Sequence, residues 1–347
     1  MKILKYLLFL ILIVIIGSAI YIAVQPNTYQ FERSKTINVP TAVVYEKVND
    51  YKEWPSFSPW MEMDPEATLS YGDKTSGDGA SYSWKGDELG VGSMKTLSAE
   101  PHKKLEQKIE FVEPFESESN ITWSFEPTEN GTKVTWGMEG KQDFMTKLYT
   151  AAMGSIEKNT APQFERGLHK LDSLLVEDVK KYDITINGIT EHSGGFYIYN
   201  TASAKIADMA SKIAEMMPQV GSYAISNNIS MAGAPFILYH KWDEENGTVM
   251  FSCCIPTASK MTTTETDILT GQLPAFKALK TTLKGNYDHL TEAWDETMAY
   301  IEEQPLKATE DGPMIEAYVN DPDSVPNPKN YITEIYIAVE EIPEVTN

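Results

Sequence analysis

Residues 331–339 read Tyr-Ile-Thr-Glu-Ile-Tyr-Ile-Ala-Val, a β-branched and aromatic run interrupted by one acid, Glu334. This composition is typical of a strand, in which successive side chains point to opposite faces of the sheet. One face then carries Glu334 and Tyr336 together with Ile332 and Ala338, and the other face is entirely β-branched. If the first face lines a cleft, Glu334 is a carboxylate among aromatic rings. The alternative is an exposed strand residue that is hydrated by water.

The residues around this strand contain an internal repeat with a spacing of roughly 85 residues. The first copy has a strand-like run over residues 184–199, a helix bearing Ile206, Met209, Ile213 and Met217, and strands at 236–242 and 249–255. The second copy has a strand at 274–283, a helix at 286–303, and strands at 314–319 and 331–339. Two such units leave a concave seam, where ligand pockets tend to form. We expect one domain over residues 182–342.

Charge in this half of the chain favours a cationic ligand. Residues 182–347 contain nine lysines, no arginine and 24 acidic residues. Sites that clamp phosphate or carboxylate usually use arginine, so an anionic ligand is disfavoured. A carboxylate with aromatic faces suits an ammonium or planar cation instead, so the ligand expected in this cleft is cationic or amphipathic.

Three motifs resemble the gyrase-inhibitor-like (GyrI-like) effector-binding family over about 160 residues. They are Lys284-Gly-Asn-Tyr-Asp-His-Leu with Ala293-Trp294, then 313–322, then 331–339, where Ala338 replaces the family's usual proline. The resemblance implies a small-molecule sensor whose buried glutamate matches Glu334 and whose aromatic cage involves Tyr287, Trp294 and Tyr318. Some relatives carry a DNA-binding domain, and a few hydrolyse reactive ligands.

Two other functions therefore stay open beside the sensor. A hydrolase would use Glu334 as general base, with Tyr287 or Tyr318 orienting the substrate. A structural adaptor would recruit a partner through one face and would have filled cavities.

Residues 28–178 predict a second domain. A strand at 31–39 and a helix opening at Pro40-Thr41 precede an aromatic turn over 51–60. Period-two segments follow at 82–84, 94–99, 105–112, 121–125 and 134–138, and Asn130-Gly131 signals a tight hairpin. A final helix is expected over 144–178, with an apolar stripe of Leu148, Ile156, Phe164, Leu168, Leu171 and Leu175. A curved sheet wrapped on one long helix usually leaves a cavity.

This order resembles the START-like polyketide-cyclase and dehydrase (SRPBCC) superfamily, the helix-grip fold. The resemblance is carried by the 54–60 aromatic turn, the Tyr82 to Ser93 strand pair and the Phe164-Glu-Arg-Gly-Leu168 helix. It implies a hydrophobic ligand between sheet and helix. Four tryptophans are candidates to line that cavity: Trp54, Trp60, Trp84 and Trp123. The alternative for each is an ordinary core position.

The first segment predicts a membrane anchor. Residues 7–24 carry no charge and, at about 1.5 Å per residue, are just long enough to cross the hydrocarbon core. A cleaved signal peptide is the alternative, although its apolar region is usually shorter. Lys2 and Lys5 precede the segment, so the N-terminus is expected in the cytoplasm and the rest of the chain outside it. The anchor would span residues 1–25.

Composition excludes several classes. The net charge of −21 repels phosphate backbones, so no nucleic-acid partner is expected. Cys253 and Cys254, the two cysteines, predict free thiols on opposite faces of one strand, with a strained vicinal disulfide as the alternative. His289 and Glu292 share a helix side but lack a third ligand at fixed spacing, so we expect no metal and no cofactor. The expected fold class is α+β. In chain order we expect a transmembrane helix, a helix-grip domain and a duplicated strand-helix-strand-strand domain.

Overall fold

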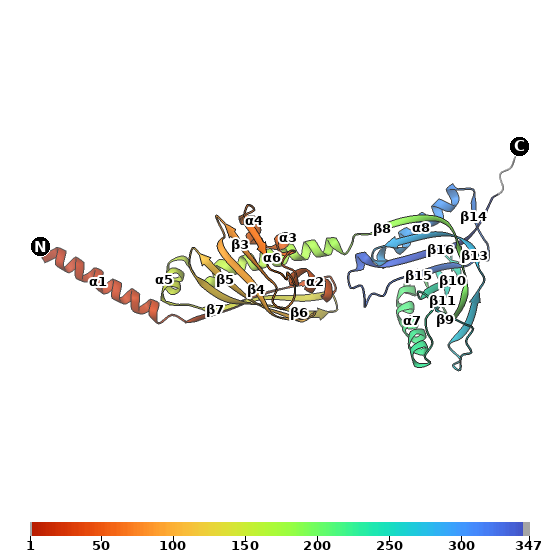
Figure 1. Cartoon of the computed structure of the whole chain (residues 1–347), viewed down its shortest axis with the longest axis horizontal. Helices are drawn as coiled ribbons and strands as arrows, with labels where there is room; N and C mark the ends of the chain where they lie inside the picture. Colours follow the sequence, from red (N-terminus) through yellow and green to blue (C-terminus); the bar gives the residue numbers. More distant parts are fainter. Residues whose placement is uncertain (1, 343–347) are drawn as a thin grey trace. The chain divides into compact units, whose positions relative to one another are not determined.

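The computed structural model describes residues 2–342 and divides into two compact units, Met1–Asp178 and Val179–Asn347 (Figure 1). Each unit has its own antiparallel sheet and its own hydrophobic core.

The first unit begins with α1 (Lys2–Ala23), a helix whose side chains are almost all exposed. Its segment Ile3–Ala23 is long and apolar enough to cross a membrane. Most of its large apolar side chains are exposed, which distinguishes α1 from a core helix.

A seven-stranded antiparallel sheet follows, with spatial order β1-β7-β6-β5-β4-β3-β2. The strands are β1 (Thr28–Ile37), β2 (Thr68–Tyr71), β3 (Ser81–Gly86), β4 (Gly90–Glu100), β5 (Lys104–Glu113), β6 (Ser117–Thr128) and β7 (Gly131–Lys141). Three short helices, α2 (Thr41–Asn49), α3 (Trp54–Phe57) and α4 (Pro59–Met63), connect β1 to β2. Gly131 adopts φ 109° at the β6–β7 turn, as the Asn-Gly signal predicts. Together with the long helix Ile156–Asp178, this is the helix-grip arrangement expected from the sequence.

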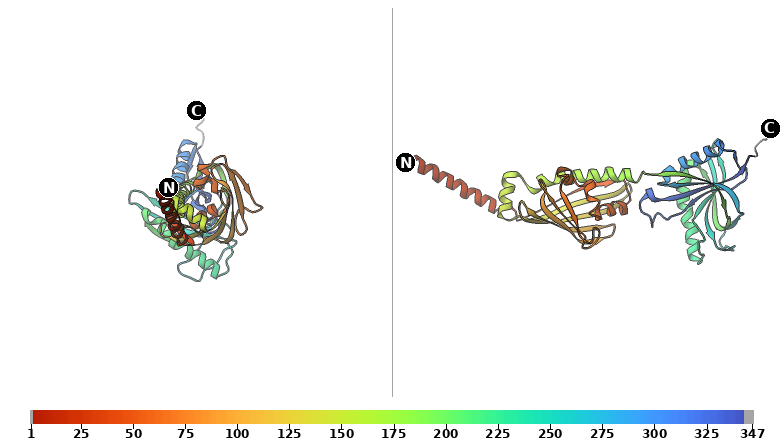
Figure 2. Two further views of the ribbon diagram at one scale, coloured as in Figure 1. Left: turned by 90° about the vertical axis from the view of Figure 1, so that its left-hand side faces the viewer. Right: turned by 45° about the horizontal axis from the view of Figure 1, so that its top comes forward.

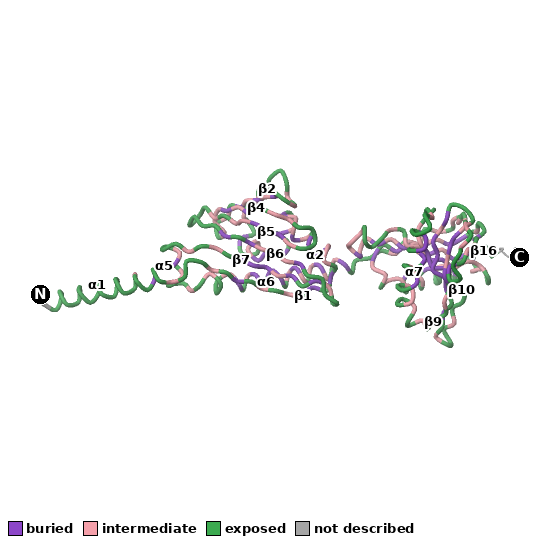
Figure 3. The backbone as a smooth tube through the Cα atoms, turned by 90° about the horizontal axis from the view of Figure 1, so that it is seen from below, coloured by how far each residue is buried: buried purple, intermediate pink, exposed green. Residues whose placement is uncertain are grey.

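The long helix α6 (Ile156–Asp178) packs against the inner face of this sheet. Phe164 of α6 stacks on Trp136 with a ring-centroid distance of 4.1 Å, and Trp136 stacks on Trp123 at 4.2 Å. Gly167, one turn further along α6, has room for no side chain, because a Cβ there would lie 2.8 Å from the Trp136 ring. In the first unit, α6, β6 and β7 carry buried residues (Figure 3), and so do the short helices α2 and α3.

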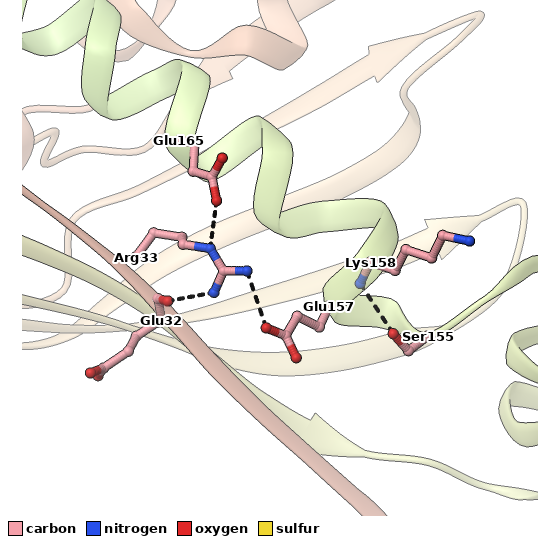
Figure 4. Close-up of polar contacts among 6 residues, drawn as sticks. All are labelled: Glu32, Arg33, Ser155, Glu157, Lys158 and Glu165. Atoms are coloured by element: carbon pink, nitrogen blue, oxygen red, sulfur yellow. Dashed lines mark hydrogen bonds and ion pairs between the residues drawn. The ribbon is translucent and has the colours of Figure 1, made fainter.

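Ion pairs hold the N-terminal half of α6 to β1 (Figure 4). Arg33 of β1 donates from Nε to Glu165 over 2.7 Å and from Nη2 to Glu157 over 3.1 Å. The same guanidinium also donates to the backbone carbonyl of Glu32. At the start of α6, the backbone N–H of Lys158 donates to the Ser155 hydroxyl, which caps the helix.

The helix expected over 144–178 is two helices, α5 (Phe144–Met153) and α6. Gly154 breaks it with φ 95°, a backbone conformation that favours glycine. Leu148 was expected in the apolar stripe of one long helix, but it lies on α5 and its exposure is 42%.

The second unit is built on a sheet with the order β12-β9-β11-β10-β15-β16-β13-β8, and β14 pairs with β16. Its strands are β8 (Asp183–His192), β9 (Gly195–Lys205), β10 (Phe236–Asp243), β11 (Thr248–Thr257), β12 (Leu269–Leu273), β13 (Phe276–Lys284), β14 (Leu306–Ala308), β15 (Met314–Tyr318) and β16 (Ile332–Glu341). Its longer helices are α7 (Met209–Ser226) and α8 (Leu290–Glu303). Figure 2 shows both helices in two further views.

The strand order confirms the duplicated strand-helix-strand-strand arrangement. The first copy contributes β9, α7, β10 and β11, the second contributes β13, α8, β15 and β16, and the copies meet where β10 pairs with β15. Each copy lends one strand to the other, because β8 pairs with β13 and β12 pairs with β9. The run 184–199 is therefore two strands, which turn at Gly194 with φ 66°.

The two faces of this sheet carry different cores. Ile237 and Phe251 belong to the core under α7, and Ile335 and Ile337 belong to the core under α8. On the opposite face, a third cluster contains Phe236, Leu238 and Ile315. Cys253 and Cys254 are free, buried thiols in the α7 core and the opposite cluster respectively, which confirms the sequence-based expectation.

Candidate functional site

Glu316 lies at the seam between the two copies of the second unit. It is the central residue of β15, between Ile315 and Ala317. In the strand register it faces Ile237 of β10 on one side and Ile335 of β16 on the other. Ile237 lies under α7 and Ile335 lies under α8, so the Glu316 side chain points to the helix-covered face. The acid therefore sits where the two hydrophobic cores adjoin.

Three aromatic residues donate hydrogen bonds to this carboxylate. The indole N–H of Trp294 donates to Oε2 over 2.8 Å, and the hydroxyl of Tyr239 donates to the same oxygen over 3.1 Å. The hydroxyl of Tyr318 donates to Oε1 over 2.6 Å. Glu316 is only 3% exposed, and this burial raises the pKa of its carboxyl group, partly offset by the three hydrogen bonds.

The aromatic rings continue beyond the direct donors. Tyr239 meets the Trp294 ring edge-to-face at a centroid distance of 5.3 Å. Tyr287 meets Tyr318 in the same way at 5.4 Å and contacts Tyr331 at 5.1 Å. Burial raises the pKa of Tyr287 to about 12, with Tyr331 and Glu316 adding to the effect. These phenols remain neutral donors at physiological pH, so the Glu316 carboxylate has neutral partners.

Within residues 2–342, Glu316 forms no ion pair with a lysine, arginine or histidine. A buried carboxylate without a cation is costly, because hydrogen bonds from neutral groups replace only part of its hydration. Such a group either holds a proton or accepts a cation from outside. The aromatic rings around it present apolar faces, and the negative electrostatic potential of these faces attracts positive charge. The arrangement can therefore serve as the counter-charge of a ligand cation.

Glu334 occupies a different environment. It faces Thr282 and Ala317 in the strand register, which places it on the sheet face opposite Glu316. Its carboxylate pairs with the ammonium of Lys280 at 2.8 Å and accepts a 2.5 Å hydrogen bond from the hydroxyl of Tyr336. The Lys280 ammonium also lies 5.5 Å from the centroid of the Tyr336 ring. The sequence suggested a solitary acid here, whereas the structure gives this acid a cation of its own.

The candidate ligand residues thus separate into two groups. Tyr287, Trp294 and Tyr318 gather around Glu316, and Tyr336 accompanies Glu334 on the other face. Sequence reasoning did not single out Glu316 or Tyr239. The available signal was the short run Met-Ile-Glu-Ala-Tyr at 314–318, in which an acid interrupts a strand that the repeat places beside the seam.

In the first unit, the candidate cavity residues form one aromatic chain. The Trp54 ring meets Trp123 at 6.0 Å and Tyr82 at 6.1 Å, and Tyr82 continues to Trp84 at 5.5 Å. Trp60 meets the Trp136 ring edge-to-face at 5.7 Å. Trp54, Trp84 and Trp123 are buried, and Trp60 is partly buried. These contacts show that the rings pack on one another along the inner face.

Two buried N–H donors on this inner face have no hydrogen-bond partner among the described residues. They are Nε2 of Gln107 and Nε1 of Trp136. Gln107 accepts a hydrogen bond from the Trp123 indole over 3.2 Å through its amide oxygen, and its side chain also lies beside the Tyr51 hydroxyl, where it partly offsets the rise of the Tyr51 pKa that burial causes. An unpaired buried donor costs free energy unless an acceptor reaches it.

Among residues 2–342, no three His, Cys, Asp or Glu side chains gather in a way that could hold a metal ion. His289 stacks on the Tyr182 ring at 3.6 Å, and its Nδ1 lies 3.6 Å from a carboxylate oxygen of Glu292.

Comparisons with known structures return many chains of similar fold. The chain is similar to the crystal structure of the EcmrR C-terminal domain at 20% identity, with a TM-score of 0.41, covering 46% of this chain and 98% of that one. It is similar to EcmrR in a DNA complex at 19% identity, with a TM-score of 0.40, covering 57% of this chain and 70% of that one. A protein from Mesorhizobium loti gives 16% identity and a TM-score of 0.34, and the match covers 43% of this chain and 98% of that one. No curated protein matches the sequence.

Family comparisons assign both units. Residues 37–168 match the family described as polyketide cyclase / dehydrase and lipid transport. Residues 198–340 match the family described as the GyrI-like small molecule binding domain. The two matches follow the order expected from the motifs. The chain therefore joins a domain of the polyketide cyclase / dehydrase and lipid transport family to a GyrI-like small molecule binding domain.

Proposed function

We propose that this protein is a membrane-anchored small-molecule-binding protein whose GyrI-like domain takes an organic cation, with Glu316 as its counter-charge. The observation that carries the proposal is the Glu316 carboxylate itself, which is 3% exposed and, among the described residues, accepts hydrogen bonds from Trp294, Tyr239 and Tyr318. A ligand cation supplies the charge that these neutral donors do not.

The chemistry of the site selects against anions. No arginine occurs after Arg166, so the second unit lacks the forked donor that usually recognises phosphate or carboxylate. The aromatic rings offer flat apolar faces, and these suit a delocalised or aryl-substituted cation better than a small hydrated one. The ligand class is therefore an amphipathic organic cation.

Binding requires the closed site to open. Tyr318 and Tyr287 lie on different elements, β15 and the short turn before α8, and their rings meet edge-to-face. A ligand ring that displaces one of these edge contacts reaches the carboxylate without disturbing the β10–β15 pairing.

The test is a calorimetric titration of the full chain in lipid nanodiscs with tetraphenylphosphonium. The matched variants are Glu316→Gln, which keeps size and hydrogen-bonding capacity, and Glu334→Gln, which changes the acid on the opposite face. We expect Glu316→Gln to weaken binding by about 30-fold or more, since removing one partner of a buried charge pair costs 2 kcal/mol or more. Glu334→Gln is expected to bind as the unmodified chain does.

Equal binding by the unmodified chain and Glu316→Gln would contradict the proposal. Loss of binding in Glu334→Gln alone would assign the cation to the Glu334 face instead. Triphenylphosphine oxide, which is neutral and of similar shape, measures the contribution of the rings without the charge.

For the first unit, we propose an apolar ligand that carries one hydrogen-bond acceptor. The unpaired donors of Gln107 and Trp136 support this, because both lie on the inner face that α6 covers. A long-chain ketone should therefore quench tryptophan fluorescence at lower concentration than the alkane of equal length. Equal concentrations for the two compounds would exclude a role for these donors.

The anchor in this proposal is α1. Its apolar length of 21 residues, Ile3–Ala23, corresponds to about 30 Å of helix, which matches the hydrocarbon thickness of a bilayer. Resistance of the full chain to extraction from membranes by alkaline carbonate supports the anchor, and release into the supernatant contradicts it.

A further inference from the structure

The helix α5 exposes an apolar surface that the packing of the first unit does not explain. Five of its ten residues are large apolar side chains with high exposure: Phe144 at 48%, Met145 at 65%, Leu148 at 42%, Tyr149 at 53% and Met153 at 60%. Lys147 is the charged residue of this helix, and it is buried. A short helix with this composition is unusual on a water-exposed surface.

Lys147 ties α5 to the end of α1. Its ammonium donates to the side-chain oxygen of Asn27 over 2.6 Å and reaches the backbone carbonyl of Ala23, the last residue of α1, over 3.4 Å. Ile22 is 7% exposed, so the last turn of α1 is packed although the rest of α1 is not. Figures 1 and 2 show α5 beside the C-terminal end of α1.

This contact fixes the depth of α5 along the bilayer normal relative to α1. The apolar length of α1 matches the hydrocarbon thickness, so its Ala23 end must lie near the boundary between lipid tails and headgroups. Only residues 24–27 separate α1 from β1. Because Lys147 contacts Ala23, the exposed side chains of α5 fall at the same boundary.

A second exposed apolar group lies at the same end of the sheet. Phe115, in the turn between β5 and β6, is 74% exposed, and Val112 is 55% exposed. The register places this turn next to the end of β7 that leads into α5, since Phe111 faces Ser117 and Ser119 faces Gly140. Thr28, the first residue of β1 after the anchor, faces Lys141. Two segments far apart in sequence thus expose apolar side chains around the exit of α1.

We propose that α5 and the β5–β6 turn insert into the interfacial layer of the bilayer that α1 crosses, and so seat this end of the first unit on the membrane. The inference rests on the anchoring role given to α1 above. Tyr149 supplies an amphipathic ring and Lys147 satisfies the end of α1, both of which suit the interfacial layer.

Charge decides the kind of lipid. Glu113 and Glu116 flank Phe115, and the whole chain has a net charge of −21. An anionic surface would repel this end of the unit. The partner is therefore a zwitterionic bilayer surface, and apolar insertion supplies the attraction.

The experiment measures nitroxide depth on the full chain in phosphatidylcholine proteoliposomes. Cys253→Ala and Cys254→Ala remove the native thiols, and single labels are then placed through Met145→Cys, Phe115→Cys, Ile13→Cys and Leu97→Cys. Ile13 reports on α1. Leu97 is the matched control, since it is 53% exposed in the same unit but lies near the other end of β4. Accessibility to oxygen relative to a water-soluble nickel complex gives the depth.

We expect the Met145 and Phe115 labels to show at least threefold lower nickel accessibility than the Leu97 label, with the Ile13 label the most deeply immersed. If Ile13 is immersed while Met145 and Phe115 match Leu97, the interfacial seat is overturned and the anchor stands. If Ile13 is also accessible to nickel, the anchoring proposal itself fails. Immersion of Met145 without Phe115 would overturn the part assigned to the β5–β6 turn.

Discussion

At the scale of single residues, Glu316 makes stability depend on pH in a direction that can be checked. Burial raises its pKa in the folded chain above the ordinary value of 4.5, so folding favours the protonated form. The stability that this group contributes is fully present below pH 4.5 and is lost as the pH rises through the folded value.

We therefore expect Glu316→Gln to unfold at a higher temperature than the unmodified chain at pH 7 and above, with the difference shrinking toward pH 4.5. Gln keeps the acceptor for Trp294 and Tyr239, and its amide can donate to the Tyr318 oxygen. Thermal unfolding across this pH range measures the difference. A constant difference at all pH values would show that Glu316 does not titrate in this range.

The choice between Glu316 and Glu334 also shows what a sequence can and cannot give. Alternation within residues 331–339 correctly separated the face of Glu334 from the face of Ile335 and Ile337. It could not say which face the helices cover at the seam. That depends on the pairing of Glu316 with Ile237 and Ile335, a long-range register that local pattern does not contain.

At the scale of elements, the position of α6 depends on the missing side chain of Gly167. A Cβ at this position would lie 2.8 Å from the Trp136 ring and 3.3 Å from Pro59. Gly167→Val is expected to destabilise the first unit by about 1–3 kcal/mol, because overpacking forces the helix away from the sheet. Denaturant unfolding measures this loss.

The matched control is Ser173→Val, on an exposed position of the same helix. It introduces the same β-branched side chain without the contact to Trp136. An equal loss in both variants would show that the contact with Trp136 is not the cause, since helix propensity by itself favours valine over glycine.

Local signals explain why most elements of both sheets could be predicted and one helix boundary was missed. Asn130-Gly131 and Asn246-Gly247 mark the hairpins where the structure has them, with φ 109° and 62° at the glycines. The pair Gly154-Ser155 carried a comparable signal, a helix-ending glycine followed by a capping serine. The apolar period on both sides of it favoured one continuous helix, and the exposure of Leu148 on α5 could not be read from that period.

At the scale of the whole molecule, the two units have separate sheets and cores, so each is expected to unfold on its own. Calorimetry of the full chain should show two transitions. Tetraphenylphosphonium at 100 times its dissociation constant should stabilise only the second unit, by about 2.7 kcal/mol, and should raise the midpoint temperature of that unit's transition alone. Gly167→Val should lower the midpoint temperature of the first unit's transition alone. This variant therefore shows which transition belongs to which unit. A single transition moved by both treatments would contradict independent units.

In the proposed site, Glu316 gives up its proton when a cation binds. Titrating tetraphenylphosphonium into the full chain in buffers of different ionisation enthalpy counts the protons released on binding. We predict a release that approaches one proton per bound cation at mildly acidic pH, that declines as the pH rises, and that is lost in Glu316→Gln. If the cation binds without proton release at any pH, or with the same proton release in Glu316→Gln, then Glu316 is not the counter-charge of the bound cation.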